Sequence, residues 1–189
     1  NPNDAKAISL GTQVYDTVAT ELEQRWYAFS VAKATKFTAA MVMDDTADFD
    51  LYVYKLNETD GTLELVGGSA IVGAGTQELS MLKLDEGIYF IGIEAATGNG
   101  SFLMYTYAGV NDGKEINDTT DLASSYVRNS RMTATIDSPF DYDYYKVVIS
   151  KNDILEYTFD QPTGCDYKVL VYDGKNYYTI NNGTYRLNT

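Results

Sequence analysis

The side chains that most often carry out chemistry in proteins are scarce in this chain. None of its 189 residues is histidine, and Cys165 is the single cysteine. Without histidine the commonest general base is missing, so Ser-His-Asp, Cys-His and zinc-protease chemistries are excluded within the chain. Asp166 follows Cys165, and a neighbouring carboxylate disfavours a reactive thiolate. We therefore expect Cys165 to be structural.

Carboxylates are the remaining groups that could act on a substrate. Two carboxylates that hydrolyse a glycoside must face each other across about 5–10 Å, and no spacing in the sequence shows such a pair. The densest acidic segment, 44–50, holds four acids in seven residues. It lacks the glycine and the closing glutamate of an EF-hand loop, so we expect a solvated hairpin turn there. The sequence does not predict an enzyme, and a carboxylate-based hydrolase is a remote alternative.

The charge and composition restrict the partners of the chain. Its 14 Lys and Arg against 27 Asp and Glu give a formal net charge of −13. Such a field repels a phosphate backbone, so no nucleic-acid partner is expected. The composition, 44% hydrophobic and 22% charged, is that of a folded globular chain. No apolar run approaches the roughly 18–20 residues of a membrane span.

Short runs rich in Tyr, Val, Ile, Phe and Thr predict an all-β fold. These runs are 26–31, 37–43, 51–56, 88–94, 102–107, 144–149, 154–159 and 167–172. Residues 16–24 leave room for a short helical turn. Residues 88–95 and 101–107, joined through Asn99-Gly100, predict a hairpin because Asn-Gly readily takes positive φ.

Internal similarity predicts a duplicated domain. Three patches recur at an offset of about 114–118 positions: 3–4 at 117–118, 26–31 at 144–149, and 48–54 at 166–172. Residues 109–113 interrupt the strand pattern and mark the boundary. We therefore predict two tandem β-sandwich domains, 1–109 and 110–189, of which the second is shortened.

The repeated segments resemble the bacterial pre-peptidase C-terminal (PPC) domain family. That family's pattern runs from Glu-x-Asn-Asp through Gly-Asp-x-Asp-Tyr-Tyr-x-Phe and Asp-x-x-Leu-Tyr-Leu-Tyr to Gly-x-Tyr-Tyr-Ile-x-Val. Here 115–118 reads Glu-Ile-Asn-Asp, 141–147 reads Asp-Tyr-Asp-Tyr-Tyr-Lys-Val, and 87–93 reads Gly-Ile-Tyr-Phe-Ile-Gly-Ile. The resemblance implies jelly-roll-like sandwiches, secretion from a bacterium, and an accessory role beside another domain.

The resemblance extends to the clostridial collagen-binding domains and through them implies a calcium ion as cofactor. In those domains calcium lies between the acidic start and the loop before the Asp-Tyr-Tyr strand. The matching residues of the second copy are Glu115, Asn117, Asp118, Asp141 and Asp143. The first copy has Asn1, Asn3, Asp4, Glu23 and Arg25 there, and the cationic Arg25 argues against a metal. The alternative is that these acids and amides cap turns.

Aromatic side chains could form a platform on which sugar rings stack. The candidate ligand-binding residues are Trp26, Tyr142, Tyr144, Tyr177 and Tyr178. The alternative is ordinary packing, with the Tyr hydroxyl at the rim of the core. We therefore predict a non-catalytic, secreted or cell-surface accessory or adhesive module that recognises an extracellular polymer, a protein surface or a neighbouring domain. A carbohydrate-binding module of a polysaccharide-degrading system is the alternative.

The second copy lacks the end of the first. The first copy continues for about fifty residues after 48–56, whereas sixteen residues follow 166–173. Three expectations remain open: Thr189 is a boundary inside a longer protein, a strand from another chain completes the sheet by β-augmentation, or 183–187 is the final strand of a compact variant. The start at Asn1 without Met suits a processed secreted chain and a cut fragment equally.

Overall fold

The computed structural model describes residues 1–109, 112–180 and 183–188, with the backbone alone for Ile180 and 183–188. The contacts divide the chain into two units. The first unit comprises Asn1–Ser125 and Asn129–Tyr145, and the second comprises Tyr126–Arg128 and Lys146–Thr189. No helix in the described part of the chain is long and apolar enough to cross a membrane.

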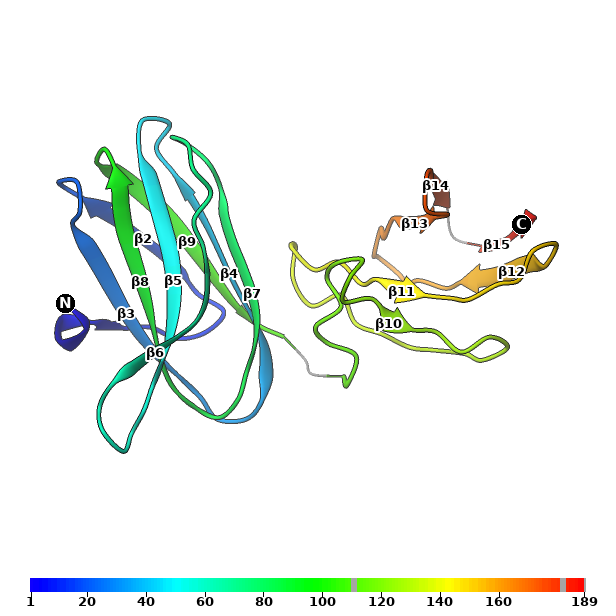
Figure 1. Ribbon diagram of the computed structural model, residues 1–189, viewed down its shortest axis with the longest axis horizontal. Helices are drawn as coiled ribbons and strands as arrows, with labels where there is room; N and C mark the ends of the chain where they lie inside the picture. Colours follow the sequence, from blue (N-terminus) through cyan, green and yellow to red (C-terminus); the bar gives the residue numbers. More distant parts are fainter. Residues whose placement is uncertain (110–111, 181–182, 189) are drawn as a thin grey trace. The chain divides into compact units, whose positions relative to one another are not determined.

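The first unit contains a β-sandwich of two sheets (Figure 1). The five-stranded sheet has the order β1 (Lys6–Ala7), β3 (Gln24–Val31), β8 (Gly87–Thr97), β5 (Asp48–Leu56), β6 (Leu63–Ser69). The four-stranded sheet has the order β2 (Gln13–Val18), β9 (Gly100–Ala108), β4 (Thr35–Met43), β7 (Glu78–Leu84). The pair β1–β3 is parallel, and a 3-10 turn, η1 (Pro2–Asp4), precedes it. The predicted all-β class is confirmed.

Alternate residues of the strands meet between the two sheets and form the core. On β3, Tyr27, Phe29 and Val31 are buried, as the period-two pattern predicts. Phe29 stacks on Phe37 of the facing sheet, with ring centroids 4.9 Å apart, and on Tyr89 of its own sheet at 5.6 Å. Because fully burying one such side chain contributes about 1.5–3 kcal/mol, these aromatic contacts hold the two layers together.

Two predicted turns are wrong because both connect strands of different sheets. Strand β8 pairs with β3 and β5, whereas β9 pairs with β2 and β4. Gly98 and Gly100 do have positive φ, of 74° and 151°, but that turn carries the chain across the sandwich. The acidic segment 44–50 likewise joins β4 to β5, and Asp48 there is buried and accepts from Gly73 N at 3.1 Å.

The helical turn allowed at 16–24 is also wrong. Asp16 lies in β2, and Gln24 begins β3. The short turn between these strands is closed by Glu23, whose carboxylate accepts from Ala19 N at 2.7 Å. The few helix-forming residues of this segment therefore lie in a polar turn between two strands. No apolar stripe of helical period accompanies them, which is the pattern that a packed helix would need.

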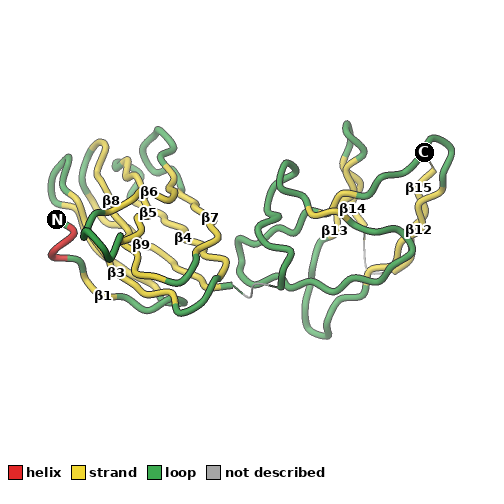
Figure 2. The backbone as a smooth tube through the Cα atoms, turned by 60° about the horizontal axis from the view of Figure 1, so that its bottom comes forward, coloured by secondary structure: helices red, strands yellow, loops and turns green. Residues whose placement is uncertain are grey.

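Beyond β9 the backbone is mostly loop, as Figure 2 shows. The strands there form two-stranded sheets: β10 (Ser124–Ser125) with β11 (Tyr145–Lys146), β12 (Ile154–Phe159) with β15 (Gly183–Asn188), and β13 (Val169–Tyr172) with β14 (Tyr177–Ile180). The predicted strand 154–159 is confirmed, whereas 144–149 shortens to β11. Residues 183–187, the proposed remnant, lie in β15, which pairs with β12.

Residues 112–180 and 183–188 do not form a second complete sandwich. The tandem arrangement, the domains 1–109 and 110–189, and completion by a strand of another chain therefore stay predictions. Val110 and Asn111, at the predicted boundary, lie outside the described residues.

Candidate functional site

The five residues predicted to bind calcium lie together in the first unit, and three of them converge on a lysine that the sequence did not point to. Lys36 Nζ is 2.7 Å from Asp141 Oδ1, 2.8 Å from Asp118 Oδ1 and 3.3 Å from Glu115 Oε2. These side chains are buried, with 0% of Lys36, 0% of Asp141, 1% of Asp118 and 3% of Glu115 exposed. We call Lys36 with these three acids the Lys36 cluster.

Asn117 and Asp143 complete the predicted set next to Glu115. Asn117 is fully buried, and with its amide nitrogen turned toward the acids it donates to Glu115 Oε2 at 3.0 Å and to Asp143 Oδ1 at 3.2 Å. The Tyr145 hydroxyl donates to Asp143 Oδ2 at 3.1 Å. Asn117 therefore links the cluster to a second carboxylate without touching Lys36 itself.

Loops rather than strands position the acids. Asp141 closes a turn, because its Oδ2 accepts from Asp137 N at 2.6 Å and its own N–H donates to Ser138 O at 3.2 Å. Carboxylate oxygens of Glu115, Asp137 and Asp141 lie within 4.8 Å of one another. Gly109 gives room for this packing, since a Cβ there would lie 1.9 Å from Asp137 Oδ2. Asp141 therefore does cap a turn, which was the alternative expectation, and it contacts Lys36 as well.

The pKa values in and beside the Lys36 cluster reflect its excess of carboxylates over ammonium groups. Burial alone would lower the pKa of Lys36, but the hydrogen bonds to Asp118 and Asp141 outweigh it and raise the pKa above its ordinary value. Burial raises the pKa of Glu115 to about 7, although Lys36 opposes the shift. Burial also raises the pKa of Asp143. A proton on Glu115 near neutral pH therefore relieves the negative charge. Calcium binding by these residues stays a prediction.

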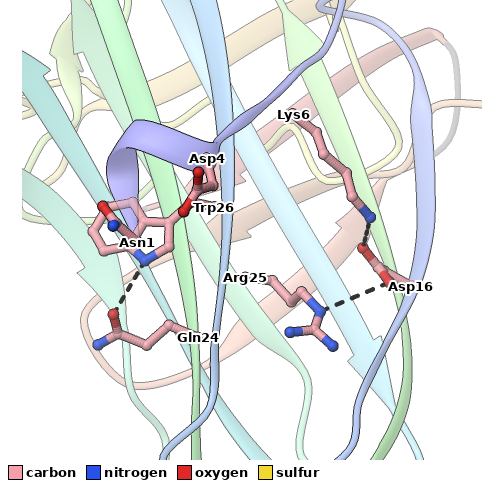
Figure 3. A pocket seen from close by; sticks show the side chains of 7 residues that line it. All are labelled: Asn1, Asp4, Lys6, Asp16, Gln24, Arg25 and Trp26. Atoms are coloured by element: carbon pink, nitrogen blue, oxygen red, sulfur yellow. Dashed lines mark hydrogen bonds and ion pairs between the residues drawn. The ribbon is translucent and has the colours of Figure 1, made fainter.

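The matching positions of the first copy lie beside a different group of charges. Asn1, Asp4 and Arg25 line a hollow of about 310 Å³ together with Lys6, Asp16, Gln24 and Trp26 (Figure 3). Lys6 Nζ is 2.5 Å from Asp16 Oδ2, and Arg25 Nε is 3.9 Å from Asp16 Oδ1. Burial would raise the pKa of Asp16, but the hydrogen bonds from Lys6 and Tyr27 outweigh it and lower the pKa. Two cationic side chains thus neutralise this hollow.

The outer face of the five-stranded sheet carries aromatic residues of β3 and β5 on either side of Gly92 of β8. Trp26 of β3 and Tyr52 of β5 are both register partners of Gly92 on β8. The indole lies over Gly92, where a Cβ would come within 3.2 Å of the ring. Tyr54, two positions along β5, has its ring centroid 5.4 Å from that of Trp26 at an interplanar angle of 37°.

A polar row runs beside the aromatic row. Gln24 and Asp50 are both register partners of Glu94. Gln24 Nε2 donates to Glu94 Oε2 at 3.1 Å, and Gln24 Oε1 accepts from Trp26 Nε1 at 3.1 Å. Tyr52 donates to Asp50 Oδ2 at 2.9 Å, and burial raises the pKa of Tyr52 to about 12, with that bond adding to the effect. We call the aromatic and polar rows together the Trp26 face.

The candidate ligand-binding residues of the sequence are divided between the two units. Within the first unit, Trp26 lies on the outer face of β3, while Tyr142 (61% exposed) follows Asp141 of the Lys36 cluster and Tyr144 lies two residues further on. In the second unit, Tyr177 and Tyr178 are exposed on β14. Tyr52, Tyr54 and the polar row were not among the ligand-binding residues predicted from the sequence. Alternation along β5 marks Tyr52 and Tyr54 as outward-facing, but their place beside Trp26 follows only from the strand register.

Comparisons with known proteins give weak likenesses. No family model and no curated protein matches the chain. Among solved structures, it is similar to the pre-peptidase C-terminal domain of a collagenase from Bacillus anthracis, with 16% identity and a TM-score of 0.47 over 56% of this chain and 97% of that one. It is also similar to a protein from Sulfurospirillum deleyianum, with 9% identity and a TM-score of 0.36 over 51% and 97%. Neither likeness carries a conclusion, so the PPC resemblance stays a prediction.

Proposed function

We propose that this chain is a non-catalytic extracellular binding module that recognises a polymer or a protein surface through the Trp26 face. The observation that supports the proposal is the pair of parallel rows on that face. Trp26 and Tyr52 stand in one row, and Gln24, Glu94 and Asp50 stand in the other. Aromatic rings beside groups that form hydrogen bonds are what recognition surfaces use for affinity and orientation.

The Trp26 face is built to stay rigid. Its side chains project from three central strands of one sheet, whose inner face supplies fully buried core residues such as Leu51, Val53 and Ile91. Trp26 lies over Gly92 and beside Tyr54, and its indole N–H donates to Gln24 Oε1. Such a platform loses little conformational freedom when a ligand binds, and this favours affinity.

A carbohydrate is the second candidate ligand, and the geometry of Trp26 favours it. Trp26 is a flat ring that is partly exposed, and the neighbouring amide and carboxylates can bond hydroxyl groups. Trp26 also forms one wall of the polar hollow of Figure 3. A ligand that covers the indole would therefore reach the side chains of both areas.

The carboxylates of the Lys36 cluster, and Asp16 in the hollow, are placed to hold the fold rather than to turn over a substrate. Those of the Lys36 cluster are almost completely buried and hydrogen-bonded to an ammonium. Asp16, in the hollow, is bonded to Lys6 and Tyr27. A glycosidase needs an acid and a base that both reach one glycosidic bond. These observations support a binding role over the remote alternative, a hydrolase.

The test is a binding array of glycans and matrix proteins, followed by affinity measurements on the best ligand. Trp26→Ala should weaken binding by at least about 30-fold, because aromatic residues at the centre of an interface contribute about 2 kcal/mol or more. Tyr15→Ala is the matched control, since Tyr15 is 71% exposed on β2 of the other sheet. Equal losses in both variants, or an unchanged affinity of Trp26→Ala, would place the binding site elsewhere. Release of hydrolysis products would reject the non-catalytic role.

A further inference from the structure

Lys36 lies on the side of β4 that a lone sandwich would leave in water. Phe37, Ala39 and Met41 point into the core, so Lys36 and Thr38 belong to the outer face of the four-stranded sheet. Both are nevertheless only 1% exposed. The residues of the first unit that follow the sandwich, 112–125 and 129–145, cover this face, because they supply the acids of the Lys36 cluster; we call them the covering segment.

Further contacts attach the same segment to the sandwich. The ring of Phe140 meets that of Tyr107 on β9 edge-to-face, with centroids 6.1 Å apart. Gly109 N donates to Lys36 O at 2.8 Å, and the Thr35 hydroxyl donates to Gly109 O at 2.8 Å. Gly109, just beyond the end of β9, therefore stays bonded to β4 beside the lysine.

The three carboxylates match the three donors of an ammonium group. A lysine ammonium has three N–H donors, and the Nζ to oxygen distances of 2.7, 2.8 and 3.3 Å run from short to long hydrogen bonds. Burying an ammonium without partners is costly. The acids of this segment therefore permit Lys36 to be buried. The Lys36 ammonium in turn supplies the positive charge that offsets part of their negative charge.

The Lys36 ammonium occupies a position that a calcium ion bound by the same three acids would need. Calcium takes 6–8 oxygen ligands at about 2.3–2.6 Å. Three carboxylates that such an ion would use already converge on Lys36 Nζ, so the ion and the ammonium would compete for the same oxygens. Ligand types suitable for calcium are present, and the space at their centre is taken by a group of this chain.

We propose that the Lys36 ammonium is the built-in cation of this cluster: it takes the place of calcium and attaches the covering segment, 112–125 and 129–145, to the sandwich without a metal. The attachment of these residues to the sandwich is then insensitive to chelators and to the calcium concentration outside the cell. This proposal is independent of the binding role of the Trp26 face, and its test involves no polymer.

The test compares thermal unfolding in a chelator and in millimolar calcium for the unaltered chain and for Lys36→Met, which keeps the apolar stem and removes the charge. The unaltered chain should shift by no more than about 1 °C between the two buffers. Lys36→Met should unfold about 10 °C lower in the chelator, because it leaves buried carboxylates without their cation, and calcium should restore much of the loss.

Lys83→Met is the matched control. Lys83 is the register partner of Lys36 on β7, so it lies on the same face of the sheet, but it is exposed. It should leave both the midpoint and the calcium response unchanged.

Three results would overturn the proposal. One is a calcium-dependent rise in the midpoint of the unaltered chain, or stoichiometric calcium binding to it by calorimetry. Another is Lys36→Met that is as stable in the chelator as the unaltered chain. The last is Lys36→Met that is destabilised but unresponsive to calcium. If Lys36→Met does not fold in the chelator, calorimetry on the unaltered chain still decides, because it needs no variant.

Discussion

Glu115 should make the stability of the first unit depend on pH near neutrality. The chain has no histidine, so no side chain with an ordinary pKa titrates in the middle of the range from about pH 5 to 8. Burial raises the pKa of Glu115 from 4.5 to about 7 in the folded state. The folded state therefore binds this proton more tightly than the unfolded state. The resulting stabilisation is fully present below the unfolded pKa and is lost as the pH rises through about 7.

The size of the effect follows from the shift. A pKa that moves from 4.5 to about 7 differs by about 2.5 units, and each unit corresponds to about 1.4 kcal/mol. Between about pH 5 and pH 8 the free energy of unfolding should fall by about 2.5 kcal/mol. Glu115 is 9% exposed, so solvent screens this shift little. This loss of free energy of unfolding is about as large as that caused by a strongly destabilising single substitution.

Urea unfolding at several pH values, with a chelator present, measures this dependence. Glu115→Gln copies the protonated acid and cannot titrate, so its free energy of unfolding should change far less across the same interval. Glu86→Gln is the control, because Glu86 is exposed in the turn between β7 and β8. If the unaltered chain and Glu115→Gln give parallel curves, the assignment of the proton to Glu115 is wrong.

Two further substitutions test the core and the Trp26 face. Phe37→Ala should lower the free energy of unfolding by about 3–5 kcal/mol in urea titrations, because the ring is fully buried and stacked on Phe29; a loss below about 1 kcal/mol would contradict the packing. Gly92→Val should displace the indole of Trp26, the sole tryptophan, and so shift its fluorescence emission and weaken ligand binding. An unchanged spectrum would show that the indole does not lie over Gly92.

Runs rich in β-branched and aromatic residues predicted five of the nine strands of the sandwich, and β6 is one of the four that they missed. That strand contains Gly67 and Gly68, which have low strand propensity. Both are needed for space, since a Cβ at Gly67 would lie 2.4 Å from Leu82 and one at Gly68 would lie 2.5 Å from the backbone oxygen of Leu51. Close approach between strands is a property of the assembled sheets, and a local pattern does not reveal it.

The acids of the candidate site could be predicted from the sequence, whereas the cation at its centre, Lys36, could not. The resemblance of 115–118 and 141–147 to one family pattern placed five residues together, and the structure brings them together. Lys36 belongs to a strand far upstream, and period-two alternation assigns it to the solvent side. Its burial depends on a loop that returns over the sheet, which no spacing within β4 indicates. A lysine in the otherwise apolar and small-residue strand 35–43 was the available signal.

The burial of both sides of β4 changes what mutation can do to this strand. Seven successive residues of β4, from Thr35 to Met41, are buried, whereas a strand on the surface of a sandwich normally tolerates change at every second position. Tolerance along β4 should therefore be low without interruption, as in the central strand of a sheet covered on both sides. A substitution of Thr38 or Ala40 by a larger polar residue would be harmless on an open sheet. Here it would disturb the packing of the residues that follow the sandwich on this face of β4.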